Sequence, residues 1–348
     1  MSGRQSPPSA SGFDVIELAP ADSCPRLAHL PEVPPVSDAD RAEHAPDCHL
    51  IVRDASGIVV ARGSCWSTGL PPLEGDRIGA IGHYAASGPE AGAVLLAHAC
   101  GRLQSAGCAR VVGPLDGNTW RSYRLVSDDA GSEPAFFLEP STPQSWCAHW
   151  RDAGFSPIAE YTSARADDLS AVDPRVDRAA ARLAADGVVI RQLATAPDDD
   201  LRRIFDVARE SFAGNFLYSP IEEAEFLEQT RRLLPFVRPE LVLLAERRRA
   251  SGDARVCGFA FAVPDLLQMR RGGAVDTVVV KTVAVRPASG VQGLGSVLVS
   301  RVHDAARRLG YRRAIHALMH ESNVSRNISR RYATTMRKYA LFGKRLAA

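Results

Sequence analysis

The chain has 348 residues, with 42 lysines and arginines against 40 aspartates and glutamates, and a net charge of +2. Its 45% hydrophobic and 24% charged residues are typical of globular proteins and exclude a mainly disordered, collagen-like or coiled-coil chain. At about 100–200 residues per domain, the length predicts two domains. No run approaches the roughly 18–20 apolar residues of a membrane span, so no membrane contact is expected.

The N-terminus and the cysteines favour a cytoplasmic protein. Residues 1–13 are rich in serine, proline and glycine and lack an apolar signal-peptide core, which predicts a disordered tail. The seven cysteines contain no CxxC pair, which favours reduced thiols. His316 and His320 lie four residues apart on an expected strand with no third ligand in sight. No metal site is therefore expected.

The first half, residues 14–167, alternates short apolar runs with one helical pattern. Strands are expected at residues 15–18, 77–85 and 108–115, with two more inside 49–64 around an Asp-Ala-Ser-Gly turn. Residues 92–106 have helical spacing and stop at Gly107. Residues 168–187 are alanine-rich with helical periodicity and are interpreted as a linker helix.

The second half, residues 188–348, follows a similar plan. Helices are expected over Asp199–Phe212, Ile221–Leu233, Ser296–Leu309 and Asn323–Arg337. Strands are expected over Val188–Leu193, Leu241–Glu246, Val256–Val263, Asp276–Val285 and Arg313–Met319. This alternation predicts an α/β (α+β) sheet domain with helices on its faces.

An internal repeat relates the two halves. Ala288–Gly310 aligns with Ala86–Gly107, and Gly295 and Gly92 are 203 residues apart, as are Gly310 and Gly107. Both copies read strand, glycine turn, helix, glycine stop, strand. The repeat predicts two structurally similar domains, although two alanine-rich helices can also resemble each other by chance.

The glycine turn of the second copy is a candidate phosphate-binding loop. A β-run leads into a loop with glycines at 290, 293 and 295, and the loop opens a helix. Backbone amides at such a helix start, unobstructed by side chains, can hold a pyrophosphate. The Lys-Ser/Thr of a Walker loop is missing, and the GxxGxG spacing differs from the GxGxxG of a Rossmann loop. A turn without any ligand is the alternative.

This order of elements resembles the GNAT superfamily of acyl-CoA N-acyltransferases. The signature Arg/Gln-x-x-Gly-x-Gly/Ala after a Val-x-Pro strand end is matched at Val285-Arg286-Pro287, Gly293 and Gly295, whereas Gly290 stands in place of Arg or Gln. The resemblance implies two tandem GNAT-like domains, each a mixed, mostly antiparallel sheet flanked by helices. It implies acetyl-CoA or another acyl-CoA as the donor. The residues expected to bind it are Val283, Val285, Gly290, Val291, Gln292, Gly293, Leu294, Gly295, Ser296 and Asn323.

The first copy is expected to be degenerate. Pro89 offers no amide hydrogen, and Glu90 places a negative charge where phosphates would lie. The donor site is therefore assigned to the second half, and the first half is expected to shape the acceptor pocket. Polar and aromatic residues there are acceptor-binding candidates, with ordinary turn or core packing as the alternative. They are Asp116, Asn118, Trp120, Tyr123 and Glu139.

The reaction implied by the resemblance needs a base, an oxyanion donor and an acid. Glu321 or His320, at the end of an expected strand, is the candidate base, with His316 a weaker one. Amides of the run Thr277–Val285 are expected to stabilise the oxyanion. Tyr332 or Tyr339 is the candidate acid; packing alone is the alternative.

The expected function is acyl transfer, most simply acetyl transfer, from acyl-CoA to a primary amine of a small molecule. Twelve basic residues after position 300, against Asp304 and Glu321, give a local excess of +10. That excess suits a polyanionic partner, so an aminoacyl-tRNA or carrier-protein thioester remains an alternative donor, as does a solvated helix face with no partner. No DNA partner is expected. A catalytically dead ligand-binding module is the non-enzymatic alternative.

Overall fold

The computed structural model describes residues 12–19, 22–27, 29–30, 33, 35–128, 133–171, 173–248, 254–287 and 289–347. Of the tail expected to be disordered, residues 1–11 lie outside this range. Among the described residues, no helix is long and apolar enough to cross a membrane. All seven cysteines are free thiols.

The first half contains every strand expected from its sequence. Helix α2 begins at Pro89, three residues earlier than expected, because proline is favourable in the first turn of a helix. Elements α1, β6, α3 and β7 were not expected from the sequence. The elements are β1 (Asp14–Leu18), α1 (Asp38–His44), β2 (Cys48–Arg53), β3 (Val59–Trp66), β4 (Ile78–Ala86), α2 (Pro89–Ser105), β5 (Arg110–Gly113), β6 (Leu125–Asp128), α3 (Trp146–Asp152) and β7 (Ser156–Ala166). Helix α4 (Pro174–Ala185) follows, inside the segment expected to form a linker helix.

The second half differs from expectation mainly at its C-terminus. The helix expected over Asn323–Arg337 is wrong, because only a short α9 forms and a strand begins at Thr334. That strand pairs on both sides, and pairing of this kind overrides local helical spacing. The elements are β8 (Val188–Gln192), α5 (Asp198–Phe212), α6 (Glu223–Leu233), β9 (Val242–Arg248), β10 (Ala254–Pro264), α7 (Leu266–Arg270), β11 (Thr277–Val285), α8 (Leu294–Arg308), β12 (Arg313–His320), α9 (Ser325–Ser329) and β13 (Thr334–Arg345).

The described strands form one 13-stranded sheet that runs through both halves. Its order is β1-β2-β3-β4-β5-β13-β7-β12-β11-β10-β9-β8, with β6 paired to β13. The parallel neighbours are β4 with β5 and β11 with β12, each joined by a helix, and the other pairs are antiparallel. The repeat seen in the sequence is thus a structural repeat, and the expected mixed, mostly antiparallel fold is confirmed.

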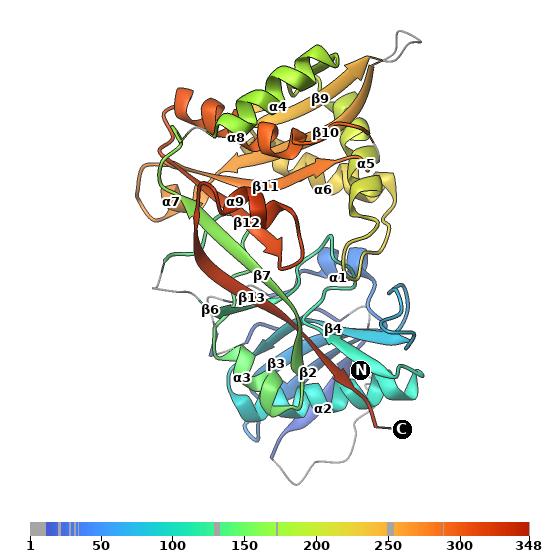
Figure 1. The fold of residues 1–348 in the computed structure, drawn as a ribbon. Coiled ribbons are helices and arrows are strands. Elements are labelled where there is room, and N and C mark those ends of the chain that lie inside the picture. Colours follow the sequence, from blue (N-terminus) through green and yellow to red (C-terminus); the bar gives the residue numbers. More distant parts are fainter. Residues whose placement is uncertain are drawn as a thin grey trace.

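The two halves exchange their last strands. Strand β7, from the first half, pairs with β12 of the second half, and β13, from the second half, pairs with β5 of the first. The two exchanged strands also pair with each other, and Figure 1 shows them running side by side from one lobe into the other. Each half therefore depends on a strand supplied by the other.

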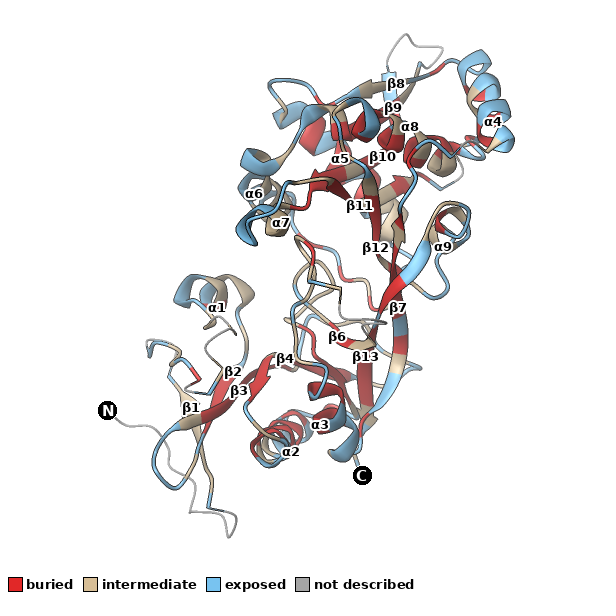
Figure 2. Cartoon of the chain, turned by 90° about the vertical axis from the view of Figure 1, so that its left-hand side faces the viewer, coloured by how far each residue is buried: buried red, intermediate tan, exposed pale blue. Residues whose placement is uncertain are grey.

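Alternating residues divide the second half into two cores. On β9, Leu243 packs with α4 and α8 on one face, and Leu244 packs with α5 and α6 on the other. In the first half, α2 and α3 cover one face of the sheet, and their largest buried side chain is Trp150. Figure 2 shows the buried layer following the strands through both lobes.

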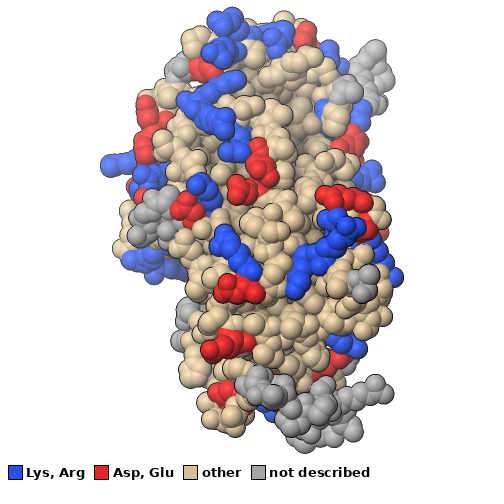
Figure 3. Space-filling model, turned by 60° about the horizontal axis from the view of Figure 1, so that its bottom comes forward, with Lys and Arg blue, Asp and Glu red and all other residues tan. Residues whose placement is uncertain are grey.

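The basic C-terminal segment is partly neutralised by acidic residues from elsewhere in the chain. On the face shown in Figure 3, basic and acidic side chains lie beside one another. Five of the twelve basic residues form such ion pairs: Arg313 with Asp276, Arg331 with Asp173, Arg337 with Glu139, Lys338 with Asp128 and Arg345 with Asp76.

Candidate active site

The parallel strands β11 and β12 separate partway along their length. They pair from Thr277 and Arg313 as far as Val280 and His316. Beyond His316, β12 stays paired with β7 across a register shift, and β11 carries a bulge opposite Phe261 and Ala262. The gap between the strands opens into a cavity of about 870 Å³.

Both halves of the chain build the cavity wall. The second half supplies residues 280–283 of β11, residues 316–320 of β12 and the end of α5. The first half supplies the loop 119–124 and residues 138–140. A small molecule held between the strands would therefore contact both halves, as sites between domains commonly allow.

The glycine loop forms the exposed N-terminus of α8. Gly290 and Gly293 have φ angles of 70° and 83°, and Gly293 is the N-cap of the helix. Within the described part of the chain, the amides of Gln292, Gly295 and Ser296 donate to no backbone carbonyl, whereas the Leu294 amide bonds the Val291 carbonyl at 3.1 Å. Free amides at a helix start are suited to an anionic group.

The loop adjoins the cavity through Gly295. A Cβ atom at this position would lie 3.3 Å from Ile328 Cδ1 and 3.9 Å from Val283 Cγ1, and both residues line the cavity. On its other side the loop rests against α4, where Arg182 donates to the Gln292 carbonyl at 2.6 Å. Helix α4 thus fixes the loop, while Gln292 and Gly293 stay exposed.

The equivalent region of the first half is closed. After β5 the chain stays bonded to β4, with Leu115 N donating to Ile81 O at 2.9 Å and His83 N to Asp116 Oδ1 at 2.6 Å. A Cβ atom at Gly82 would lie 2.4 Å from Leu115 O. The gap found between β11 and β12 is therefore absent between β4 and β5, which agrees with a degenerate first copy.

His320 lies in the cavity wall and is held as a hydrogen-bond donor. Its Nδ1 accepts from the Ser322 amide at 3.1 Å, which assigns the hydrogen to Nε2. That Nε2 is buried and has no partner among the described residues. The ring stacks on Phe216 at 5.9 Å, and burial lowers its pKa.

His316, the weaker base candidate, also lines the cavity, and its two ring nitrogens lie 2.9 Å from His303 Nε2 and 2.9 Å from Ser329 Oγ. The remaining three predicted catalytic residues lie outside the cavity wall. Glu321 is exposed, and its carboxylate accepts from the Glu160 amide at 3.3 Å. Tyr332 packs edge-on against His303, on the α4 and α8 side of the sheet. Tyr339 is fully buried in β13 and donates to a carboxylate oxygen of Glu139.

Of the residues expected to bind the acceptor, Trp120, Tyr123 and Glu139 line the cavity. Glu139 is fully buried and accepts from Arg337 at 2.5 Å as well as from Tyr339. Asn118 bonds the Trp120 amide within its own turn. Asp116 is turned away from the cavity, toward His83.

Of the residues expected to bind the donor, Val283 and Asn323 line the cavity. The Asn323 side chain also accepts from the Ser325 amide at 3.0 Å. The others form the end of β11, the glycine loop and the start of α8. They are Val285, Gly290, Val291, Gln292, Gly293, Leu294, Gly295 and Ser296.

Arg124 and Lys281 are cationic residues of the cavity wall that were not identified from the sequence. Arg124 is 6% exposed, lies 3.7 Å above the Tyr123 ring and 4.0 Å from the Tyr161 ring, and donates to Leu318 O at 3.3 Å. Its Nε has no partner within the described structure. Lys281, at the β11 bulge, donates to Leu138 O at 3.2 Å. Burial, aided by the positive charge of Arg124, lowers the pKa of Lys281 to about 7.

Comparisons with known proteins agree on the fold. No protein-family profile and no curated protein sequence matches the chain. Among solved structures, a GCN5-related N-acetyltransferase from Sphaerobacter thermophilus is similar at a TM-score of 0.50 and 16% identity, over 97% of each chain. A tandem GNAT protein from the clavulanic acid biosynthesis pathway is similar at 0.51 and 14%, over 97% of this chain and 99% of that one.

A third similar structure is the glucosamine N-acetyltransferase region of a fungal multi-domain β-N-acetylglucosaminidase. Its TM-score is 0.56 at 14% identity, over 95% of this chain, which spans 38% of the fungal one. At these identities the likeness concerns the fold. The chain has the tandem fold of GCN5-related N-acetyltransferases.

Proposed function

We propose that this chain is an N-acyltransferase with one donor site, in its second half. It transfers an acyl group, acetyl in the simplest case, from acyl-CoA to the primary amine of a small molecule that also carries a negative charge. The observation that supports this most strongly is the opening between β11 and β12. It leads into a cavity of about 870 Å³ that adjoins the free amides at the start of α8.

The residues around the opening fit acyl-CoA. The amides of Gln292, Gly295 and Ser296 would hold the pyrophosphate, and the missing side chain at Gly295 leaves room beside Ile328. The expected signature has Arg or Gln where this chain has Gly290, and the amides alone supply the cradle. Acyl-CoA supplies an activated thioester, and the cavity side chains handle the acceptor amine and the protons.

Lys281 is proposed as the base. A pKa of about 7 leaves a large fraction of its amine neutral at neutral pH, and a neutral amine can accept a proton from the acceptor's ammonium group. Glu139 is less suited, because both of its oxygens already accept hydrogen bonds from Arg337 and Tyr339. His320 is proposed as a donor, because its lone pair on Nδ1 is used by the Ser322 amide.

Arg124 is proposed to bind the negative group of the acceptor. Its guanidinium is buried in the cavity wall, and its Nε has no partner among the described residues. Glu139 is the one carboxylate in the described part of that wall. Because Glu139 is held by Arg337, the charge of Arg124 is left to be balanced by the acceptor. An α-amino acid or short peptide offers both the amine and the carboxylate.

The test is a thiol-release assay with the full chain, acetyl-CoA and a panel of matched amines. The panel pairs amino acids with the amines that result from their decarboxylation. We expect turnover with at least one carboxylate-bearing amine and much weaker turnover with its decarboxylated partner. Absence of thiol release across the panel, together with absence of acetyl-CoA binding, would overturn the proposed function.

A further inference from the structure

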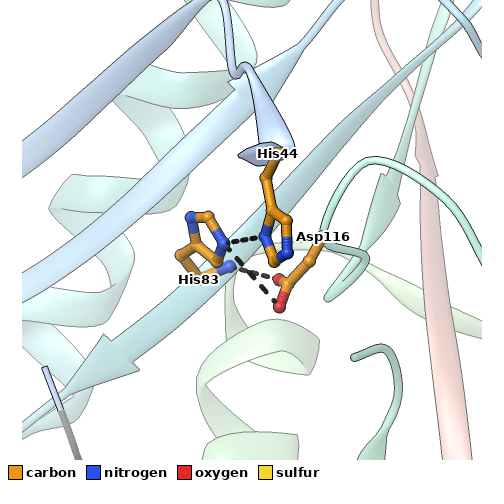
Figure 4. A group of neighbouring side chains, drawn as sticks. All are labelled: His44, His83 and Asp116. Carbon is orange, nitrogen blue, oxygen red and sulfur yellow. Dashed lines mark hydrogen bonds and ion pairs between the residues drawn. The ribbon is translucent and has the colours of Figure 1, made fainter. Parts of the chain in front are cut away.

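Three metal-ligand side chains converge in the first half, remote in sequence from one another. His44 ends α1, His83 lies on β4, and Asp116 follows β5. His44 Nδ1 and His83 Nε2 are 2.8 Å apart, and Asp116 Oδ2 lies 3.9 Å from His83 Nε2. Figure 4 shows the two rings and the carboxylate turned toward a common point.

A second layer of side chains orients His83. Ser64 Oγ lies 2.9 Å from His83 Nδ1 and 2.6 Å from His49 Nδ1, and His49 Nε2 lies 3.1 Å from Cys24 Sγ. One assignment satisfies the chain of contacts: His83 Nδ1–H donates to Ser64, and the Ser64 hydroxyl donates to His49. That assignment leaves the Nε2 lone pair of His83 facing His44. Metal-binding histidines are typically fixed through their other ring nitrogen in this way.

The backbone at His83 is held in an uncommon conformation. Its φ angle is 49°, in the left-handed region that non-glycine residues seldom adopt. The Asp116 carboxylate holds this conformation by accepting from the His83 amide at 2.6 Å. The same carboxylate thus fixes the backbone through Oδ1 and presents Oδ2 to the imidazole side. Such local strain is often found where a side chain must be aimed at a ligand.

A cationic side chain beside the cluster is already paired with a carboxylate. Arg121, which donates to the His44 carbonyl, is paired with Glu225 at 2.8 Å.

We propose that His44, His83 and Asp116 bind a divalent transition-metal ion, with Zn²⁺ as the expected ion. Two imidazole nitrogens and one carboxylate oxygen are a donor set that Zn²⁺ accepts, with water completing a tetrahedron. Ligand atoms at about 2.0–2.1 Å from the ion lie about 3.3 Å apart in that geometry. The separations of 2.8 Å between His44 and His83 and 3.9 Å between His83 and Asp116 bracket this value, and all three ligand atoms lie within 4.8 Å of one another, so side-chain adjustment is needed to reach it.

The ion would anchor one wall of the cavity. Asp116 begins the loop whose later residues, from Thr119 to Arg124, line the cavity, and its amide donates to Ser122 O at 3.0 Å. The His44 carbonyl accepts from Trp66 Nε1 at 2.8 Å and from Arg121. Binding at His44 and Asp116 therefore joins α1 to the base of this loop. The site lies outside the proposed donor site and does not depend on the proposed function.

The test is metal binding by the purified full chain without acyl-CoA. After treatment with a chelator, the chain is titrated with Co²⁺ and with Zn²⁺. We expect each chain to bind one equivalent of either metal ion. The Co²⁺-bound chain should show the visible d–d absorption of a nitrogen-ligated site, and Zn²⁺ should raise the Tm. Absence of both the absorption and the bound equivalent in the unmodified chain would overturn the proposal without recourse to any variant.

Single substitutions test which side chains bind the metal ion. His44→Gln and Asp116→Asn should each lose the bound equivalent, and Ser64→Ala should lower the affinity about tenfold or more by freeing His83. His98→Gln changes a partly exposed histidine on α2 outside the cluster and should bind as the unmodified chain does. Retention of the equivalent by both His44→Gln and Asp116→Asn, in folded proteins, would contradict the assignment.

Discussion

Tyr339 in β13 is directly opposite Tyr161 in β7, at the antiparallel pair that joins the two halves of the sheet. Each of these strands belongs by sequence to one half and extends the sheet of the other. The sheet edge left by removing either strand would expose unpaired backbone groups.

The first prediction concerns this exchange. Residues 1–187 and 188–348, expressed separately, should each aggregate, and expressed together they should form a 1:1 complex. Solubility and size-exclusion chromatography with light scattering measure this, with the intact chain as control. A soluble monomer with its own sharp thermal transition, from either half alone, would contradict the prediction.

The second prediction concerns Arg124. Arg124→Gln should raise the KM for a carboxylate-bearing acceptor by about 10–100-fold, because a hydrogen bond to a charged group contributes about 1.5–3 kcal/mol. The decarboxylated amine should be affected much less. Lys338→Gln removes an exposed basic residue and is the matched control, with no expected change. An equal loss with both amines would argue against recognition of a carboxylate.

The third prediction is a pH profile set by Lys281. Below a pKa of about 7 its amine is protonated and cannot act as a base, so kcat/KM should rise with pH and level off above about 7. Lys281→Met should lower kcat about 100-fold, within the usual range for a general base, and remove this rise. A Lys281→Met variant with the unmodified profile would exclude the role.

The same pKa makes a prediction for stability. Between about pH 7 and 10.5 the unfolded chain holds a proton on Lys281 that the folded chain lacks, so this group opposes folding, and its unfavourable contribution shrinks as pH rises. Lys281→Met should therefore gain stability relative to the unmodified chain near pH 7, and the gain should shrink toward pH 10. Chemical denaturation at several pH values measures it. A gain independent of pH would contradict the assigned pKa.

A further prediction distinguishes structural from catalytic roles of two tyrosines. Tyr339→Phe should lower the free energy of unfolding by about 1–3 kcal/mol, because buried Glu139 loses a hydrogen bond. Tyr332→Phe should change stability little, because its buried hydroxyl has no partner among the described residues. Both variants should keep kcat within about threefold. A large loss of kcat in a stable Tyr332→Phe protein would restore tyrosine to the mechanism.

Local features of the fold were predictable from the sequence. The glycine loop and α8 follow from glycines at fixed spacing after an apolar run, and these signals act within a few residues. The helix expected over Asn323–Arg337 overlaps the start of β13, because the stability of this strand comes from pairing with β5 and β7, which lie far away in sequence. Its exchange between halves has no local signature.

The candidate site, too, was predictable only where a local signal exists. Trp120, Tyr123 and Glu139 were selected by residue type and do line the cavity. Lys281 was passed over because its character depends on a bulge and on Arg124, which come together only in the folded chain. His44, His83 and Asp116 belong to three separate elements, so no spacing rule identifies them.

The central claim, one acyl-CoA site at the start of α8, is tested most directly by calorimetric titration of the full chain with acetyl-CoA. Gly295→Asp places a negative charge among the free amides, and Gly88→Asp places the same charge at the N-cap of the equivalent helix α2, where a Cβ atom meets nothing within 4 Å. The account predicts one equivalent bound by the unmodified chain and by Gly88→Asp, and at least tenfold weaker binding by Gly295→Asp. The account would be contradicted if the unmodified chain did not bind acetyl-CoA, or if only Gly88→Asp bound it more weakly.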